Sequence, residues 1–349
     1  MCLHSLRWLA LLAAANLFAA NPAAGQQSGA AGGRVSDAEI ETMAGGAAGF
    51  GKKIEEALRR EPVAPNGARA SHVNARYGPH PRNTFDLWIA DAERPSPLAV
   101  FIHGGGFRRG DKALLYDSTL LAGLLEHGIS VAGIHYRFSS QTEEGTLGSL
   151  KDAARFVQFL RLHADSYKID PRRIACYGGS AGAAASLWLN FRDDMADPGS
   201  ADPVARQSTR LTCAGAMAAP STLDYLKWPD IFGISLARLG EMARGSGFEW
   251  DEVEVQSERG ARLRAETDLL ALMSPGDPPF FVHNNEEGGP PRHFGHMAHH
   301  PYHARVLKQR AAEVGLEAVI HAPRIGLHDP AGGDLVAFLV RHLKPSKRN

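Results

Sequence analysis

Cysteine is scarce in this chain, which has three in 349 residues, and neither sign of charge is in excess, since Lys plus Arg and Asp plus Glu each number 38. The zero net charge and the lack of a basic stripe argue against nucleic acid or an anionic membrane surface as a partner. Cys176 and Cys213 lie in apolar runs typical of buried strands, and we expect both to be free thiols. Small neutral molecules are the favoured partners.

Long hydrophobic runs are also missing, apart from an N-terminal run at residues 8–20 that is short for a bilayer span. One positive charge precedes this run, and small residues follow it at Ala23 and Gly25. The pattern predicts a cleaved signal peptide at 1–25 and a flexible leader at 26–36, so we expect a secreted or periplasmic protein. An uncleaved membrane anchor is the alternative.

No internal repeat is visible, and after the leader the pattern alternates between strand and helix. Strands are predicted at 84–90, 98–103, 129–136, 174–177, 211–217, 280–283 and 316–320, and helices at 37–60, 114–126, 150–163, 183–189, 302–314 and 333–343. This alternation predicts one α/β domain over 37–349, with a mostly parallel sheet between helices. Residues 222–277 interrupt it with charged, helix-like sequence containing Trp228, Phe232 and Trp250, which we expect to form a cap that selects the substrate.

A single serine, Ser180, stands in the stretch GGSAG, between a short apolar run and a helix of small residues. Gly178 and Gly182 flank it with G-x-S-x-G spacing, as a sharp strand-to-helix turn requires. Such a turn would hold the Ser180 hydroxyl clear of the sheet. A serine present by chance in a glycine-rich turn is the alternative, because short motifs match by accident.

Three consecutive glycines follow an earlier strand in the stretch HGGGF at 103–107. No G-K-[ST] or G-x-G-x-x-G pattern accompanies them, which argues against a phosphate loop. Backbone N–H groups of such a loop can converge on an oxyanion, and a nucleophilic serine needs that support. The two glycine motifs together predict acyl-transfer chemistry.

The motif HGGGF, followed by KIDPRRIACYGGSAG around Ser180, resembles the α/β-hydrolase superfamily, and within it the hormone-sensitive-lipase and bacterial feruloyl-esterase-like carboxylesterases. The resemblance covers roughly residues 77–342. It implies an α/β-hydrolase fold with a helical cap insertion. It also implies that the oxyanion donors are the backbone N–H groups of Gly105, Gly106 and Ala181.

A serine nucleophile needs a base and an acid, which this fold supplies later in the chain. His328 lies between the last predicted strand and the last helix, where the base belongs, and His321 at the strand end is its rival. The resemblance places the acid at Glu287, beside Glu286, because related sequences carry an aspartate four residues after the strand's histidine. Asp224, after the preceding strand, is the alternative acid.

Five histidines gather in PRHFGHMAHHPYH, at positions 293, 296, 299, 300 and 303. Imidazoles at such spacings can bind zinc, but no Cys or acid completes a ligand set within the run, and we expect a partly exposed loop. The sequence thus predicts a carboxylic-ester hydrolase with a Ser180–His328–Glu287 triad and a small-molecule ester substrate, needing no cofactor or metal. A peptidase of the prolyl-oligopeptidase kind and a catalytically silent binding protein are the alternatives.

Overall fold

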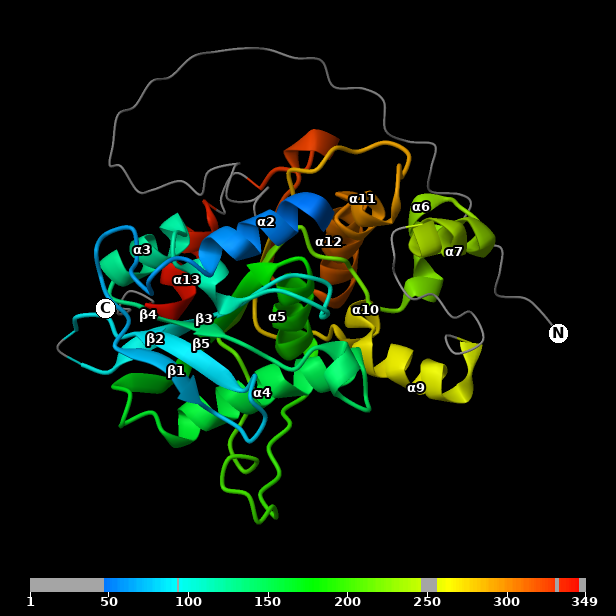
Figure 1. Ribbon diagram of the computed structural model, residues 1–349. Coiled ribbons are helices and arrows are strands. Elements are labelled where there is room, and N and C mark those ends of the chain that lie inside the picture. The colour runs from blue at the N-terminus through cyan, green and yellow to red at the C-terminus, as the bar shows by residue number, and fades with distance from the viewer. Residues whose placement is uncertain (1–46, 93, 246–255, 330–332, 345–349) are drawn as a thin grey trace, which may run out of the picture. The chain divides into compact units, whose positions relative to one another are not determined.

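One eight-stranded sheet organises the part of the chain that the structure, a computed structural model, describes (Figure 1). The described residues are 47–92, 94–245, 256–329 and 333–344. The predicted signal peptide at 1–25, the leader at 26–36, the first part of the predicted helix at 37–60 and Trp250 lie outside these ranges.

The strands follow the spatial order β1-β2-β4-β3-β5-β6-β7-β8. Pairing is antiparallel from β1 to β2 and from β2 to β4, and parallel across the rest of the sheet. The predicted α/β class with a mostly parallel sheet is therefore confirmed. The strand bounds are β1 His72–Arg76, β2 Thr84–Trp88, β3 Ser96–Ile102, β4 Ser130–Ile134, β5 Ile169–Gly179, β6 Cys213–Met217, β7 Phe280–His283 and β8 Ala318–His321.

Helices cover both faces of this sheet (Figure 1). On one face α3 and α13 pack over the central strands, and on the other α4, α5 and α12 form a second apolar layer. The helix bounds are α2 Ala47–Ala57, α3 Thr119–Glu126, α4 Thr146–Leu162, α5 Ala181–Phe191, α6 Trp228–Phe232, α7 Leu236–Gly245, α9 Glu258–Thr267, α10 Leu269–Leu272, α11 Phe294–Ala298, α12 Tyr302–Val314 and α13 Leu335–Leu343. In these described ranges no helix is both long enough and apolar enough to cross a bilayer.

Burial on both faces explains the composition of the central strands. Every residue of β3, β4 and β6 is buried, as expected for parallel strands covered by helices on each side. Cys176 and Cys213 lie on neighbouring strands of this core as free thiols, as predicted.

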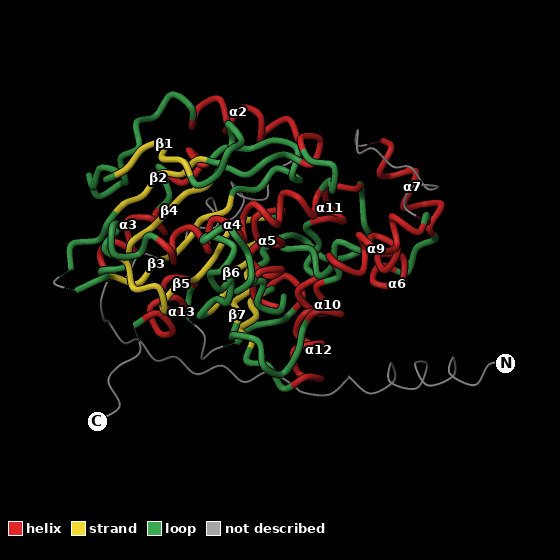
Figure 2. Tube along the Cα trace, turned by 90° about the horizontal axis from the view of Figure 1, so that it is seen from below, coloured by secondary structure: helices red, strands yellow, loops and turns green. Residues whose placement is uncertain are grey.

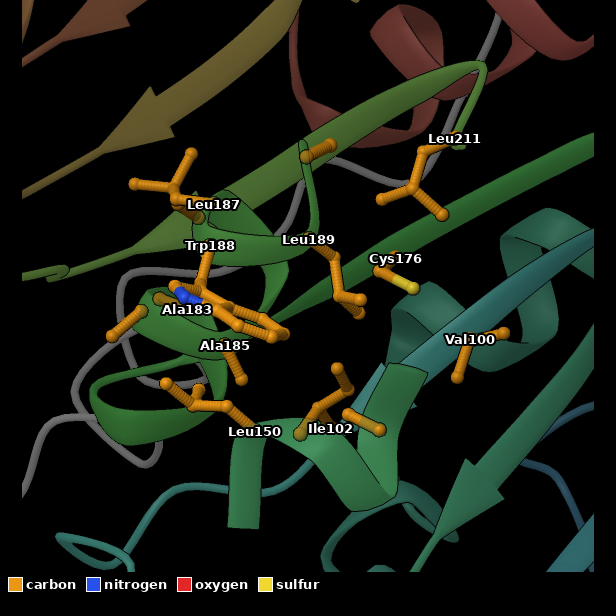
Figure 3. Packing of buried hydrophobic residues seen from close by; sticks show 14 of the residues in the cluster. Val100, Ile102, Leu150, Cys176, Ala183, Ala185, Leu187, Trp188, Leu189 and Leu211 are labelled. Carbon is orange, nitrogen blue, oxygen red and sulfur yellow. The ribbon is translucent and has the colours of Figure 1, made fainter. Parts of the chain in front are cut away.

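Helix α5, which follows Ser180, is enclosed on every side, since all of its residues are buried. Figure 3 shows Trp188 and Leu189 of α5 among side chains from β3 and α4, including Ile102 and Leu150. The Trp188 indole also donates a 2.8 Å hydrogen bond to the Glu266 carbonyl. This packing gives the residue that precedes α5, Ser180, a rigid support.

The segment predicted as a cap contains α6, α7, α9 and α10, which lie on the side of α11 in Figures 1 and 2. Helix α7 contacts α11, and α6 contacts α12. Trp228 and Phe232 of α6 pack with Phe294 and Met297 of α11 in a separate apolar cluster, called the cap cluster below. Helices α6 and α7 of the cap are therefore joined to the segment that carries the histidine run.

Candidate active site

Ser180 makes the whole turn between β5, which ends at Gly179, and α5, which begins at Ala181. Its φ of 55° and ψ of −119° lie in a region that non-glycine residues rarely adopt. A Cβ on Gly178 would lie 2.2 Å from the Ile102 carbonyl oxygen, and one on Gly182 would lie 1.9 Å from the same atom. Both flanking glycines are therefore required by close backbone contact.

The Ser180 hydroxyl has a histidine partner, His299, whose Nε2 lies 2.7 Å from the serine Oγ. His299 follows the short helix α11 at its C-terminal cap. The imidazole also forms a hydrogen bond with the Gly295 backbone that raises the imidazole pKa, as a bond donated by the ring does. With Nδ1 donating to Gly295, Nε2 is left to accept the proton of the serine hydroxyl.

The protein environment keeps this imidazole neutral. The pKa of His299 is lowered to about 4; desolvation is the largest cause, and the neighbouring His293 and His296 contribute in the same direction. The Gly295 hydrogen bond opposes this shift without cancelling it. At neutral pH the His299 imidazole is therefore neutral, and its Nε2 can accept a proton from the adjacent Ser180 hydroxyl.

The loop after β3 lies against the start of α5, because β3 and β5 are parallel neighbours that pair Ile102 with Gly178. A Cβ on Gly182 would come within 3.0 Å of the His103 carbonyl carbon, so the two glycine-rich turns touch. Gly105 and Gly106 have φ values of 111° and 63°, which only glycine adopts readily. The predicted oxyanion donors Gly105, Gly106 and Ala181 thus belong to two turns in contact.

His103 holds the glycine loop after β3 in place, a role that was not predicted from the sequence. Its buried ring stacks on Tyr136 with centroids 4.3 Å apart, and its Nδ1 lies 2.8 Å from the Gly104 carbonyl oxygen. The Tyr136 hydroxyl donates to the His103 carbonyl at 2.8 Å. Burial lowers the pKa of His103 to about 3, so the ring stays neutral inside this network.

Known proteins resemble this chain in part of its sequence and in its architecture. Residues 85–202, less than half of the chain, match the family model BD-FAE. A probable isoprenylcysteine alpha-carbonyl methylesterase of Arabidopsis thaliana is 34% identical over 137 residues, which cover 39% of this chain and 28% of that protein. The chain thus matches less than a third of that relative's length.

Two solved structures extend the comparison to most of the fold. The match to a truncated carbohydrate esterase from gut microbiota covers 81% of this chain and 97% of that protein, with a TM-score of 0.56 and 14% identity. The match to the acetyl ester-xyloside bifunctional hydrolase of Caldicellulosiruptor lactoaceticus covers 75% of this chain and 85% of that protein, with a TM-score of 0.51 and 21% identity. The chain has the α/β-hydrolase fold. The resemblance predicted from the two glycine motifs is confirmed.

Within this α/β-hydrolase fold, the predicted base and acid are seen with partners other than Ser180. His328 is exposed after β8, and its Nδ1 lies 3.1 Å from Nδ1 of His321. Glu287 is exposed, and its carboxylate lies 3.4 Å from the Arg292 guanidinium. The hydrogen bond to Ser180 expected of His328 is made by His299 instead, because α11, predicted as loop, brings His299 to the serine.

The alternative acid, Asp224, belongs to the cap of the hydrolase fold. Its carboxylate pairs with Arg264 at 3.1 Å and accepts a hydrogen bond from the Leu226 N–H. Burial raises its pKa. The residue at the carboxyl end of β7 that reaches the His299 segment is Asn284, whose side-chain amide donates to the His299 carbonyl at 2.8 Å. Asn284 was not predicted from the sequence, because only the acidic residues of that loop were candidates for the partner of the base.

The remaining histidines of the run form hydrogen bonds with the backbone of their own segment. The His296, His300 and His303 Nε2 atoms lie 2.8, 2.9 and 3.0 Å from the carbonyl oxygens of Glu287, Gly289 and Met297, and the His293 ring accepts from the His296 N–H. Among the described residues no group of three or more His, Cys, Asp or Glu side chains is arranged to hold a metal ion. In this part of the hydrolase fold the histidines brace the loop that presents His299.

Proposed function

We propose that this chain is a serine hydrolase of small-molecule carboxylic esters that works through an acyl-enzyme on Ser180. The observation that carries the proposal is the 2.7 Å contact of the Ser180 hydroxyl with His299 Nε2, on a strained turn beside a glycine loop. A positioned nucleophile, a neutral base and nearby backbone donors are the three parts that acyl transfer requires.

The reaction divides into two half-reactions of the same kind. Ser180 Oγ attacks the ester carbonyl carbon while His299 Nε2 takes the hydroxyl proton, and the resulting oxyanion is stabilised by N–H groups of the two glycine turns. Collapse of this intermediate expels the alcohol, which takes the proton from Nε2. Water then attacks the acyl-enzyme with His299 again as base, releasing the carboxylic acid and restoring the serine.

His299 is the base that the geometry supports, and the pair His328 with Glu287 is the alternative that the family resemblance implies. The Gly105, Gly106 and Ala181 amides are the proposed oxyanion donors in either case. Orientation of His299 through the Gly295 backbone takes the place of the carboxylate that completes many triads.

The substrate class rests on the similar proteins, whose names describe a methylesterase, a carbohydrate esterase and an acetyl ester hydrolase. We extend ester hydrolysis to this chain on that basis. The N-terminal pattern at 1–25 further supports export, so the proposed substrate is an ester met outside the cytoplasm.

Replacing Ser180 tests the proposal directly. Ser180→Ala should lower kcat on short p-nitrophenyl esters by several orders of magnitude while the thermal unfolding midpoint stays close to wild type, because the change removes one partly exposed hydroxyl and no apolar core contact. A fluorophosphonate probe should label the wild-type protein at Ser180, as mapped by mass spectrometry. Cleavage of a peptide amide in preference to the esters would favour the peptidase alternative, and absence of both labelling and turnover would favour the binding protein.

A further inference from the structure

Asn284 links the sheet to the proposed base. It follows β7 directly, and its backbone N–H donates to the His321 carbonyl at 2.8 Å, so its main chain continues the pairing with β8. Its side chain has no exposed surface. The position of this side chain is therefore set by the main chain of the sheet.

Both ends of the Asn284 amide are used. Nδ2 donates to the His299 carbonyl oxygen at 2.8 Å, and Oδ1 accepts from the Glu286 N–H at 3.0 Å. The first bond reaches across 15 residues and ties the backbone of His299 to the carboxyl end of β7. A buried amide that loses such a partner leaves a polar group without compensation.

The ring of His299 is otherwise held by contacts of its own segment and of Ser180. Its imidazole contacts Ser180 Oγ and the backbone of Gly295, which lies four residues earlier in α11. A short helix can shift as a unit, and such a shift would carry the ring and its Gly295 partner together. The Asn284 bond relates the backbone of His299 itself to the sheet edge next to which Ser180 lies, through β5 and β6, while the His296 ring adds a contact with the Glu287 carbonyl after β7.

We propose that Asn284 is a positioning residue that holds the His299 backbone so that the imidazole stays in line with the Ser180 hydroxyl. This inference rests on the proposed function, in which His299 is the base. A displacement of about 1 Å between reacting groups can cost about a hundredfold in rate, so a single buried bond is sufficient for the effect.

A matched control exists at the other end of β7. Asn190 is likewise fully buried, and its Nδ2 donates to the Pro278 carbonyl at 2.7 Å, before the strand begins. Removing either amide breaks one buried bond to a loop carbonyl, and replacement by alanine at Asn284 also removes the acceptor of the Glu286 N–H, which the aspartate variant keeps. Only the bond of Asn284 leads to His299.

The test compares Asn284→Ala and Asn284→Asp with Asn190→Ala and Asn190→Asp. Aspartate keeps the size of the side chain and the acceptor for Glu286, but it lacks the donor to His299, so it serves if the alanine variant does not fold. The main measurement is the rate of Ser180 labelling by a fluorophosphonate, which reports nucleophile activation without an ester substrate. Circular dichroism and thermal unfolding establish that each variant is folded.

Both Asn284 variants should label about 10- to 100-fold more slowly than wild type, with a matching loss of kcat and a KM within about threefold. The Asn190 variants should label within about twofold of wild type even where their unfolding midpoints fall equally. Asn284 variants that label as fast as their Asn190 counterparts would overturn the inference.

Failure of the proposed function would look different. Unchanged labelling in His299→Asn would overturn the assignment of the base, and the inference with it. Slow labelling in His299→Asn together with wild-type labelling in Asn284→Asp would overturn the inference alone.

Discussion

At the scale of single residues, backbone strain shapes the turn at Ser180 and desolvation sets the protonation state of His299. Ser180 accepts a positive φ, and Gly178 and Gly182 allow the backbone of Ile102 to approach, so the hydroxyl is presented at a turn of one residue. His299 is held neutral by desolvation. Backbone strain thus shapes the turn of the proposed nucleophile, while desolvation keeps the proposed base neutral.

Replacing each candidate histidine separates the two possible bases. His299→Asn should reduce kcat/KM by at least about a thousandfold, since the serine loses its proton acceptor, whereas His328→Asn should stay within a few-fold of wild type. The base acts in its neutral form, so activity rises as pH increases through its pKa. With the pKa of His299 at about 4, the acid limb of kcat/KM for a neutral ester should have its midpoint near pH 4.

The pH profile needs a stability control, because acid also weakens the fold. Each sample is returned to pH 7 after the assay, and only reversible losses are counted. A midpoint between pH 6 and 7, as expected for a histidine at its reference value, would contradict His299 as the base. A larger loss in His328→Asn than in His299→Asn would transfer the role to His328.

At the scale of elements, the cap packs against the segment that carries the proposed base, His299. Trp228 of α6 stacks on Phe294 of α11 with centroids 5.6 Å apart and contacts the His303 ring at 5.1 Å. His303 is held in turn by the Ser221 hydroxyl at 2.9 Å. Trp228 is 1% exposed, so its ring fills the cap cluster and is not offered to a substrate, in contrast to the aromatic cover predicted from the sequence.

Truncating Trp228 should therefore act on stability and on kcat together. Trp228→Ala removes a buried indole and should lower the free energy of unfolding by about 3–5 kcal/mol. The loosened α11 should also lower kcat, with little change in the preference between p-nitrophenyl acetate and butyrate. Urea unfolding and steady-state kinetics measure the two effects, with the exposed Leu58→Ala as a control. A changed acyl preference at unaltered stability would restore the role of Trp228 as a substrate contact.

For the whole molecule, buried neutral histidines couple stability to pH. Burial lowers the pKa of His103 and His303 to about 3 and that of His299 to about 4. Between these values and the unfolded value near 6.5, the unfolded chain binds more protons than the folded one, so stability falls as pH falls. Each such group contributes up to about 1.4 kcal/mol per pH unit in this window.

The free energy of unfolding should thus decrease steeply from pH 6.5 toward pH 4, and change little between pH 7 and 8 from this cause. Urea titrations at half-unit intervals measure the slope. His303→Gln should be less stable than wild type at pH 7 but should show a shallower slope, since one titrating group is removed. A slope equal to that of wild type would mean that His303 is not a source of the pH dependence.

Local patterns in the sequence determined the fold class, most elements and the strand-to-helix turn at Ser180. The bounds of β7 and α12 agree with prediction to the residue. The spacing of their apolar residues and the polar residues on either side are local features of the sequence, so they can be recognised without knowledge of the rest of the fold. Strand β1 and helix α11 were missed. β1 is a largely exposed edge strand and α11 has five residues, so neither has a periodic apolar pattern long enough to recognise.

Tertiary structure decided which histidine meets Ser180. Sixteen histidines are present, and the order of elements along the chain favoured His328, which follows β8. The hydrogen bond instead joins Ser180 to His299, 119 positions later in the chain. Packing of α11 in the cap cluster and the bond from the Asn284 amide place His299 there. Contacts between segments so distant depend on how side chains fill space between helices, and neither spacing nor composition encodes that packing locally.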